Sequence, residues 1–210
     1  RDVAVTGVQT CALPIYGVLF GNTRFIALNF ALTFMGLGYF GFVAGSSSIY
    51  ISGFGVSEQT YGFLFGLNGF AIMAGSFVSA RLCATMSAQA LLRYSLVGMV
   101  AASIVLAATG GPSATSVALC MFAITVFYGM SRPVSNHLLL DLVQQDVGAA
   151  SALMTFSLFV WGAVAMMIIS LNWDSKAGML GWLGVIGAAV PLLAILVLHR
   201  YSPRPIRNEG

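Results

Sequence analysis

Long uninterrupted apolar runs constrain this chain more than any other feature of its sequence. The 210 residues are 59% hydrophobic and only 7% charged, whereas roughly a quarter of the residues in a soluble domain are charged. The apolar residues form runs of about 18 or more, the length that an α-helix needs to cross a bilayer. Backbone groups in lipid must be hydrogen-bonded internally, so these runs predict helices. We therefore predict an all-α membrane protein.

The apolar runs divide into six expected spans, which predict a six-transmembrane-helix bundle. We expect them at about residues 25–50, 60–80, 91–109, 113–130, 147–171 and 177–198. Ser57 and Glu58 have the pattern of a helix N-cap and first turn before the second span. The sequence Gly110–Pro112 predicts the break between the third and fourth spans. Pro191 lies inside the sixth span and predicts a kink.

The distribution of basic residues predicts how the spans are oriented. One side carries Arg24, Arg81, Arg93, Arg132, Arg200, Arg204 and Arg207, and the other side carries Lys176. Basic residues near the ends of spans stay in the cytoplasm, so we expect both ends of the six-helix unit there. We expect no formal charge inside the apolar spans, and therefore no proton relay in this segment.

The first fifteen residues differ from the rest of the chain. The stretch RDVAVTGVQTCALPI lacks the basic region and long apolar core of a signal peptide. It resembles the translation of sequencing-adapter read-through found in assembled metagenomic genes, and the alternative is an ordinary polar leader. We therefore expect residues 1–15 to be an artefactual leader on a gene that continues upstream. Residues 16–24 would then be a linker, 25–198 the transmembrane bundle and 199–210 a basic cytoplasmic tail.

No pattern in the sequence predicts an enzyme, a metal site or a nucleic-acid interface. Cys11, Cys83 and Cys120 are scattered and have no metal-ligand spacing. The sequence has no phosphate-binding loop, no zinc-protease motif and no nucleophile elbow. It also has no basic face with interleaved aromatic residues. We expect no catalytic residue, no metal, no cofactor and no nucleic-acid partner.

Two groups of glycines recur at three- and four-residue spacing, so each group lies on one face of a helix. They are Gly38, Gly41 and Gly45 in the first span, and Gly62, Gly66 and Gly69 in the second. Small residues on one face let two membrane helices approach closely. We expect both groups to serve packing, and the alternative is sliding during a conformational cycle. The six spans could also be two inverted three-helix repeats.

Five polar or aromatic residues inside the apolar spans are candidates for lining a substrate cavity. They are Asn29, Tyr39, Asn68, Tyr128 and Trp161. A buried amide without a partner costs about 1 to 3 kcal/mol, so each asparagine must find a bond or face water. Aromatic faces suit flat or cationic ligands. The alternative is interhelical hydrogen bonding for the asparagines and packing for the aromatic residues. His137 follows Pro133, and we expect it in a loop.

Several segments, in order along the chain, resemble one family of membrane transporters. They are Tyr16–Phe25 (YGVLFGNTRF), Ser46–Tyr50 followed by Gly55–Ser57, Tyr61–Asn68 (YGFLFGLN), Gly129–Pro133, and Gly148–Leu153 followed by Trp161–Ala163. Together they resemble the C-terminal half of the major facilitator superfamily, specifically the Bcr/CflA drug-resistance transporters. Two positions depart from that pattern. Ser48 stands where the family usually has a proline, and Val134 stands where an asparagine usually follows the proline.

The resemblance implies one half of a twelve-helix fold, with a central cavity between two six-helix halves. It implies multidrug efflux by alternating access and proton antiport in the bacterial inner membrane. The family's proton-linked acidic residues usually lie in the other half. The expected partners are a missing N-terminal six-helix half, a small, mostly apolar or cationic substrate, and membrane lipid. The alternative is a membrane structural or assembly subunit that transports nothing.

Overall fold

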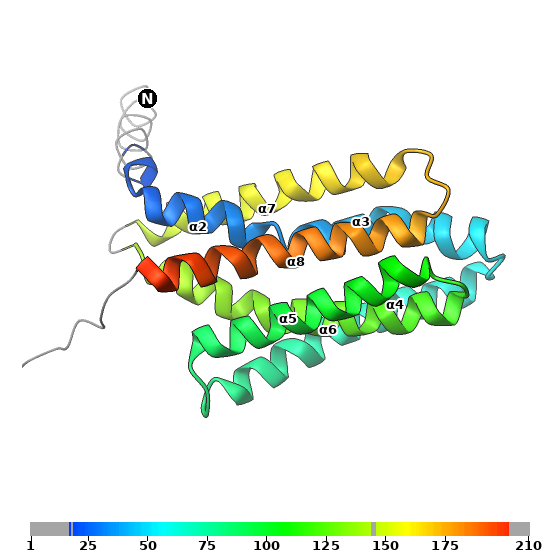
Figure 1. Ribbon diagram of the computed structural model, residues 1–210, viewed down its shortest axis with the longest axis horizontal. Coiled ribbons are helices and arrows are strands. Elements are labelled where there is room, and N and C mark those ends of the chain that lie inside the picture. The colour runs from blue at the N-terminus through cyan, green and yellow to red at the C-terminus, as the bar shows by residue number, and fades with distance from the viewer. Residues whose placement is uncertain (1–16, 18, 144–145, 202–210) are drawn as a thin grey trace, which may run out of the picture.

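Six helical stretches, each long and apolar enough to cross a membrane, make up the described part of the chain (Figure 1). The computed structural model describes residues 17, 19–143 and 146–201, so the expected leader and most of the expected tail lie outside the described residues. The elements are α2 (Thr23–Thr33), α3 (Gly36–Ser47), the π-helix η1 (Ser48–Gly53), α4 (Glu58–Leu82), α5 (Ala88–Thr109), α6 (Ala114–Leu140), α7 (Val147–Ser170) and α8 (Lys176–Tyr201). The first span consists of α2, α3 and η1. The chain is a multi-pass membrane protein, and the predicted six-helix bundle is confirmed.

Helix ends lie close to where the turn and cap residues predict them. The Ser57 hydroxyl accepts a hydrogen bond from the Thr60 N–H at 3.3 Å and caps α4. At the end of α5, Gly110 and Gly111 both have positive φ angles, of 62° and 66°. Glycine adopts this left-handed conformation at little cost, which ends the helix and turns the chain toward α6.

The first span bends where the sequence predicts one continuous helix. Two hydrogen bonds that span three residues instead of four mark the bend. The Phe34 N–H donates to the Ala31 carbonyl at 3.3 Å, and the Met35 N–H donates to the Leu32 carbonyl at 3.4 Å. Just before the bend, the Thr33 hydroxyl donates to the carbonyl of Asn29 at 2.7 Å. Threonine hydroxyls that bond back to the preceding turn often bend helices. The bend therefore has a local cause and lies between α2 and α3.

The fourth span is longer than predicted, because α6 continues through Pro133 to Leu140. A proline has no N–H, so it leaves the carbonyl four residues earlier without its helical partner. Here that carbonyl belongs to Gly129, and the Ser76 hydroxyl of α4 donates to it at 3.1 Å. The predicted end of the fourth span at about residue 130 is therefore wrong. His137 is helical rather than in a loop, with Nδ1 3.5 Å from Oδ1 of Asp141.

Two arginines that the sequence assigns to loops lie more than one turn inside a helix. Arg93 is in the second turn of α5, and Arg132 lies eight residues before the end of α6. The expectation of charge-free spans therefore fails at both positions. Each arginine is half-buried, and the Nε atom of Arg93 has no hydrogen-bond partner in the part of the chain that the structure describes.

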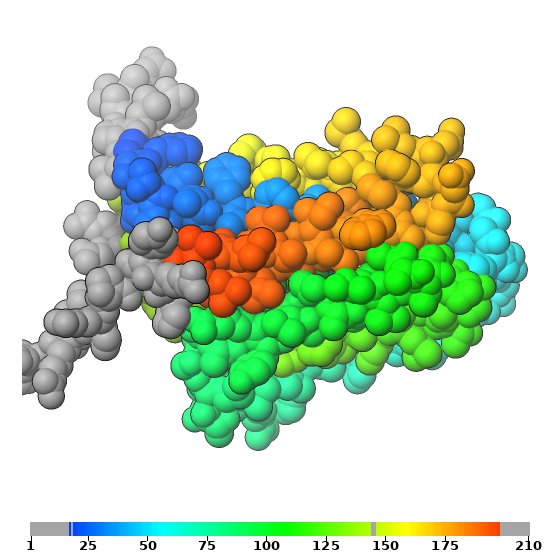
Figure 2. All heavy atoms as spheres, viewed as in Figure 1, coloured from blue at the N-terminus to red at the C-terminus, as the bar shows by residue number. Residues whose placement is uncertain are grey.

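The packing of the helices has an internal symmetry. The first span packs against α7 and α8, α6 packs against α4 and α5, and α5 packs against α8. Exchanging each of the first three spans with the span three places later leaves this set of contacts unchanged. Two structural repeats produce such a pattern. Figure 2 shows α8 lying between α2 and α5, so this face of the bundle is closed.

The first glycine group packs as predicted. An added Cβ would lie 3.0 Å from the Gly184 Cα at Gly38, 3.0 Å from the Leu183 Cδ1 at Gly41, and 2.7 Å from the Ile169 Cγ1 at Gly45. The first span therefore uses this face against both α7 and α8.

The second glycine group does not pack within the bundle. An added Cβ at Gly62, Gly66 or Gly69 would have nothing within 4 Å. This face of α4, together with the exposed Phe63 and Phe70, is open in the described structure. The close contact of α4 is made instead by Gly75, on the side that packs on α6.

Candidate functional site

The first and fourth spans of the bundle meet through a pair of tyrosines. The rings of Tyr39 on α3 and Tyr128 on α6 are stacked, with centroids 5.0 Å apart and planes 12° apart. Tyr128 is buried and Tyr39 is half-buried. Phe40 packs edge-on against Tyr39 at 5.5 Å. Two candidates that lie 89 positions apart are thus brought into direct contact.

Trp161 on α7 makes a second aromatic contact with the first span. Its ring lies 3.9 Å, centroid to centroid, from that of Phe34 at the bend of the first span. The indole Nε1 is buried and has no hydrogen-bond partner among the described residues. An indole N–H is a donor only, and a buried donor without a partner costs about 1 to 3 kcal/mol. Trp161 therefore offers a donor that a bound molecule or a water could use.

Asn29 on α2 faces α7, where its partner Ser157 lies one helical turn before Trp161. It is fully buried, and its Nδ2 donates to the Ser157 hydroxyl at 2.8 Å. Its Oδ1 has no partner in the described part of the chain. Ser157 and Trp161 are four residues apart on α7, so they share a face. These contacts of the first span with α7 thus carry an unpaired acceptor on Asn29 and an unpaired donor on Trp161.

Asn68 differs from Asn29 because both ends of its amide are bonded. Its Nδ2 donates to the Leu64 carbonyl at 3.0 Å, and its Oδ1 accepts from the Thr125 hydroxyl at 2.9 Å. The second bond joins α4 to α6. These contacts correspond to the interhelical role that the sequence left open for Asn68.

Three residues beside the candidates were not found from the sequence. Phe34 and Ser157 contact Trp161 and Asn29, respectively. Arg132 lies one turn beyond Tyr128 on α6, with no carboxylate within 4.0 Å among the described residues. The four-residue spacing of Ser157 from Trp161 was a usable signal. The sequence does not indicate Arg132, because the fourth span is predicted to end at about residue 130.

Acidic side chains lie only near helix ends or in loops, as far as the structure describes the chain. They are Glu58, Asp141, Asp146 and Asp174. We call the contacts of the first span with α6 and α7 the seam, and it comprises Tyr39, Tyr128, Trp161, Asn29 and Ser157. The seam therefore has aromatic, amide and hydroxyl groups and, one turn beyond Tyr128, a guanidinium. No three His, Cys, Asp or Glu side chains gather as a metal site within the described residues. The arrangement is suited to noncovalent contact with a small molecule.

Comparison with known proteins finds transporters. The chain is 29% identical over 187 residues to an uncharacterized MFS-type transporter, YdgK, of Bacillus subtilis, which covers 88% of this chain and 46% of the relative. It is 25% identical over 203 residues to a bicyclomycin resistance protein homolog of Haemophilus influenzae, covering 92% of this chain and 48% of the relative. No family model matches the chain. The chain spans about half the length of the curated relatives it matches.

Proposed function

We propose that this chain is the C-terminal half of a secondary active exporter of small, mostly apolar or cationic molecules. The observation that carries the proposal is the aromatic seam of the first span with α6 and α7, in a bundle about half as long as its transporter relatives. Major facilitator transporters consist of two six-helix halves with the substrate site between them near the midplane. The seam would form one wall of that site.

The side chains of the seam favour flat apolar ligands. Tyr39, Tyr128 and Trp161 present large aromatic surfaces that stack on planar molecules, and the unpaired groups of Trp161 and Asn29 could orient them. Aromatic faces also attract cations. Arg132 opposes a cation bound beside Tyr128, so a cationic substrate would need carboxylates from the other half. The same half would supply the acidic residue for proton antiport.

The open face of α4 supports a partner half. Gly62, Gly66 and Gly69 have nothing within 4 Å, while Phe63 and Phe70 beside them are exposed. Small residues on a membrane helix allow another helix to approach closely. We propose that helices of the missing N-terminal half cover this face. Basic residues of the described chain lie toward the bundle end opposite Lys176. This distribution supports an orientation in the inner membrane with both ends of the six-helix unit in the cytoplasm.

A chimera tests the exporter. The upstream half of the Haemophilus influenzae relative would be joined to residues 16–210 and expressed in an efflux-deficient bacterium. We expect lower dye accumulation and better growth in bicyclomycin, both abolished by a protonophore. Residues 16–210 alone should insert in the membrane and export nothing, because alternating access needs two bodies. The full-length relative is the positive control.

A pair of tyrosine variants connects export to the seam. Tyr128→Ala should raise dye accumulation at least several-fold toward the level without transporter, because it removes the stacked wall. Tyr94→Ala is the matched control, since Tyr94 is exposed on α5 and should leave export unchanged. A chimera that reaches the membrane at the level of the full-length relative yet exports nothing would contradict the proposal. Export by residues 16–210 alone would contradict the assignment as a half.

A further inference from the structure

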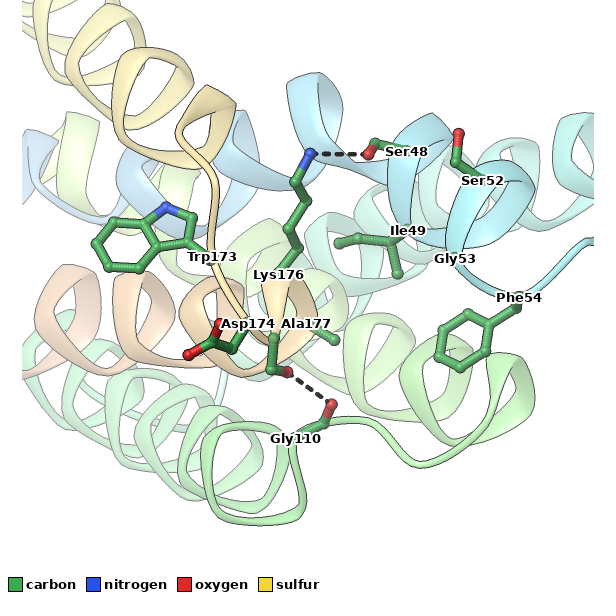
Figure 3. Close-up of a pocket in the computed structure, with 11 residues that line it drawn as sticks. Ser48, Ile49, Ser52, Gly53, Phe54, Gly110, Trp173, Asp174, Lys176 and Ala177 are labelled. Carbon is green, nitrogen blue, oxygen red and sulfur yellow. Dashed lines mark hydrogen bonds between the residues drawn. The ribbon is translucent and has the colours of Figure 1, made fainter.

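A pocket of about 350 Å³ lies at the bundle end where η1 finishes and α8 begins (Figure 3). Its walls come from η1, from Gly110 between α5 and α6, and from the loop between α7 and α8. Figure 3 shows Lys176 reaching across one side of the pocket toward Ser48, with Gly110 on the opposite side. Ile49 and Phe54 supply apolar wall. Neither the seam nor the proposed transport cycle uses this pocket.

Lys176 is the cation of this pocket and has no anionic partner within it. Its half-buried ammonium donates to the Ser48 hydroxyl at 2.9 Å, and no carboxylate lies within 4.0 Å among the described residues. Asp174 also lines the pocket, but its carboxylate points away from the ammonium (Figure 3). An ammonium has three donors, so two remain for a ligand.

The position of Lys176 in its helix adds to the positive potential of the pocket. It is the first residue of α8, and no acidic residue lies in the first turn of that helix. The start of a helix is the positive end of its dipole, so a cation there is unfavourable without an anion nearby. A bound anion would compensate both the ammonium and the dipole.

The other polar groups of the pocket determine which anion fits. Ser48 accepts from Lys176, so its own O–H is available to donate, and Ser52 places a second hydroxyl four residues later. Ser175 is already engaged, because it donates to the Gly110 carbonyl at 3.1 Å. One ammonium and two hydroxyls would match the several acceptor oxygens of a phosphate group.

The place of the pocket in the bundle indicates the source of such a phosphate. It lies at the ends of apolar spans, at the depth where a bilayer has its headgroups. Trp173, in the same loop, is exposed, and tryptophan is enriched at this interface. We propose that Lys176, Ser48 and Ser52 bind a phosphate group, supplied by a phospholipid headgroup. This proposal is independent of the proposed export function.

The experiment uses the fact that Lys176 is the only lysine in the sequence. An amine-acylating reagent then modifies Lys176 and the terminal amine, which serves as internal reference, and mass spectrometry follows both. Rates would be compared between phosphatidylglycerol nanodiscs and phosphate-free galactolipid nanodiscs. A second comparison, in maltoside detergent, would set inorganic phosphate against sodium chloride of equal ionic strength. We expect Lys176 to react at least threefold more slowly in the phospholipid disc than in the galactolipid disc.

A double variant locates the effect in the pocket. Ser48→Ala with Ser52→Ala should abolish the protection of Lys176, while Ser170→Ala should keep it, since Ser170 is exposed and bonds only within α7. Circular dichroism would verify that the variants stay helical. Protection by phospholipid supports the headgroup as source, and protection by inorganic phosphate alone supports the phosphate chemistry but overturns that source. Equal rates in both comparisons, or protection that survives the double variant, would overturn the site.

Discussion

The crossing of α4 and α6 allows a direct test of how tightly the bundle is packed. In Gly75→Ala, the new Cβ would lie 3.0 Å from the Met130 backbone nitrogen and closer still to the Val126 carbonyl oxygen. Both neighbours are backbone atoms, so no side-chain rotation can relieve the contact. The two helices must separate, which also stretches the bond from Ser76 to the Gly129 carbonyl.

The magnitude follows from opposing terms. Overpacking costs about 1 to 3 kcal/mol, and weakening the Ser76 bond adds about 0.5 to 1.5 kcal/mol. Replacing glycine by alanine within a helix returns up to about 1 kcal/mol. We expect a net destabilisation of about 0.5 to 3.5 kcal/mol. At about 2 to 4 °C per kcal/mol for a chain of this size, the Tm should fall by roughly 1 to 14 °C.

The matched control is Gly66→Ala on the same helix, where an added Cβ meets nothing within 4 Å. The purified chain in detergent would be heated while circular dichroism at 222 nm is recorded. Gly66→Ala should leave the Tm unchanged or raise it. The packing argument is refuted if Gly75→Ala melts at or above the Tm of the unsubstituted chain, or if both variants lose stability equally.

The remaining predictions concern the proline in α6 and the orientation in the membrane. Ser76→Ala should lower the stability by about 0.5 to 1.5 kcal/mol. The loss should be much smaller in a Pro133→Ala background, because the restored N–H of residue 133 then bonds the Gly129 carbonyl. Additive effects in a double-mutant cycle of thermal melts would contradict this account. A reporter fused after residue 204 should read cytoplasmic and one inserted at 110–113 should read external, and reversed labelling of both sites would overturn the orientation.

The spans were predictable because membrane insertion depends on local composition. A run of apolar residues needs no tertiary partner to form a helix in lipid, since its backbone bonds are satisfied within the run. Caps such as Ser57 are equally local. The end of α6 was not predictable, because the group that compensates Pro133 is Ser76, 57 positions earlier in the sequence. A helix that continues through a proline depends on what packs beside it.

The residues of the candidate seam were identifiable by type, but their pairing was not. Polar and aromatic side chains in apolar spans are conspicuous, so the sequence selects Asn29 and Asn68 alike. The structure separates them: both ends of the Asn68 amide are bonded, while the Asn29 Oδ1 has no partner among the described residues. That difference depends on which helix lies opposite each asparagine, and spacing along one helix does not contain this information.

The two glycine groups have similar spacing and different surroundings, and the difference makes the open face of α4 testable. In the first span the glycines contact α7 and α8, whereas Gly66 and its neighbours contact nothing. Each glycine in a helix is up to about 1 kcal/mol less favourable than alanine, and contact with lipid does not compensate this cost. Close packing against a helix of the proposed N-terminal half would compensate this cost. Gly66→Ala should be neutral for the isolated bundle. In the chimera it should reduce export by about half and therefore raise dye accumulation. If export in the chimera is unaffected by Gly66→Ala and by the larger Gly66→Leu, lipid covers this face and the docking argument fails.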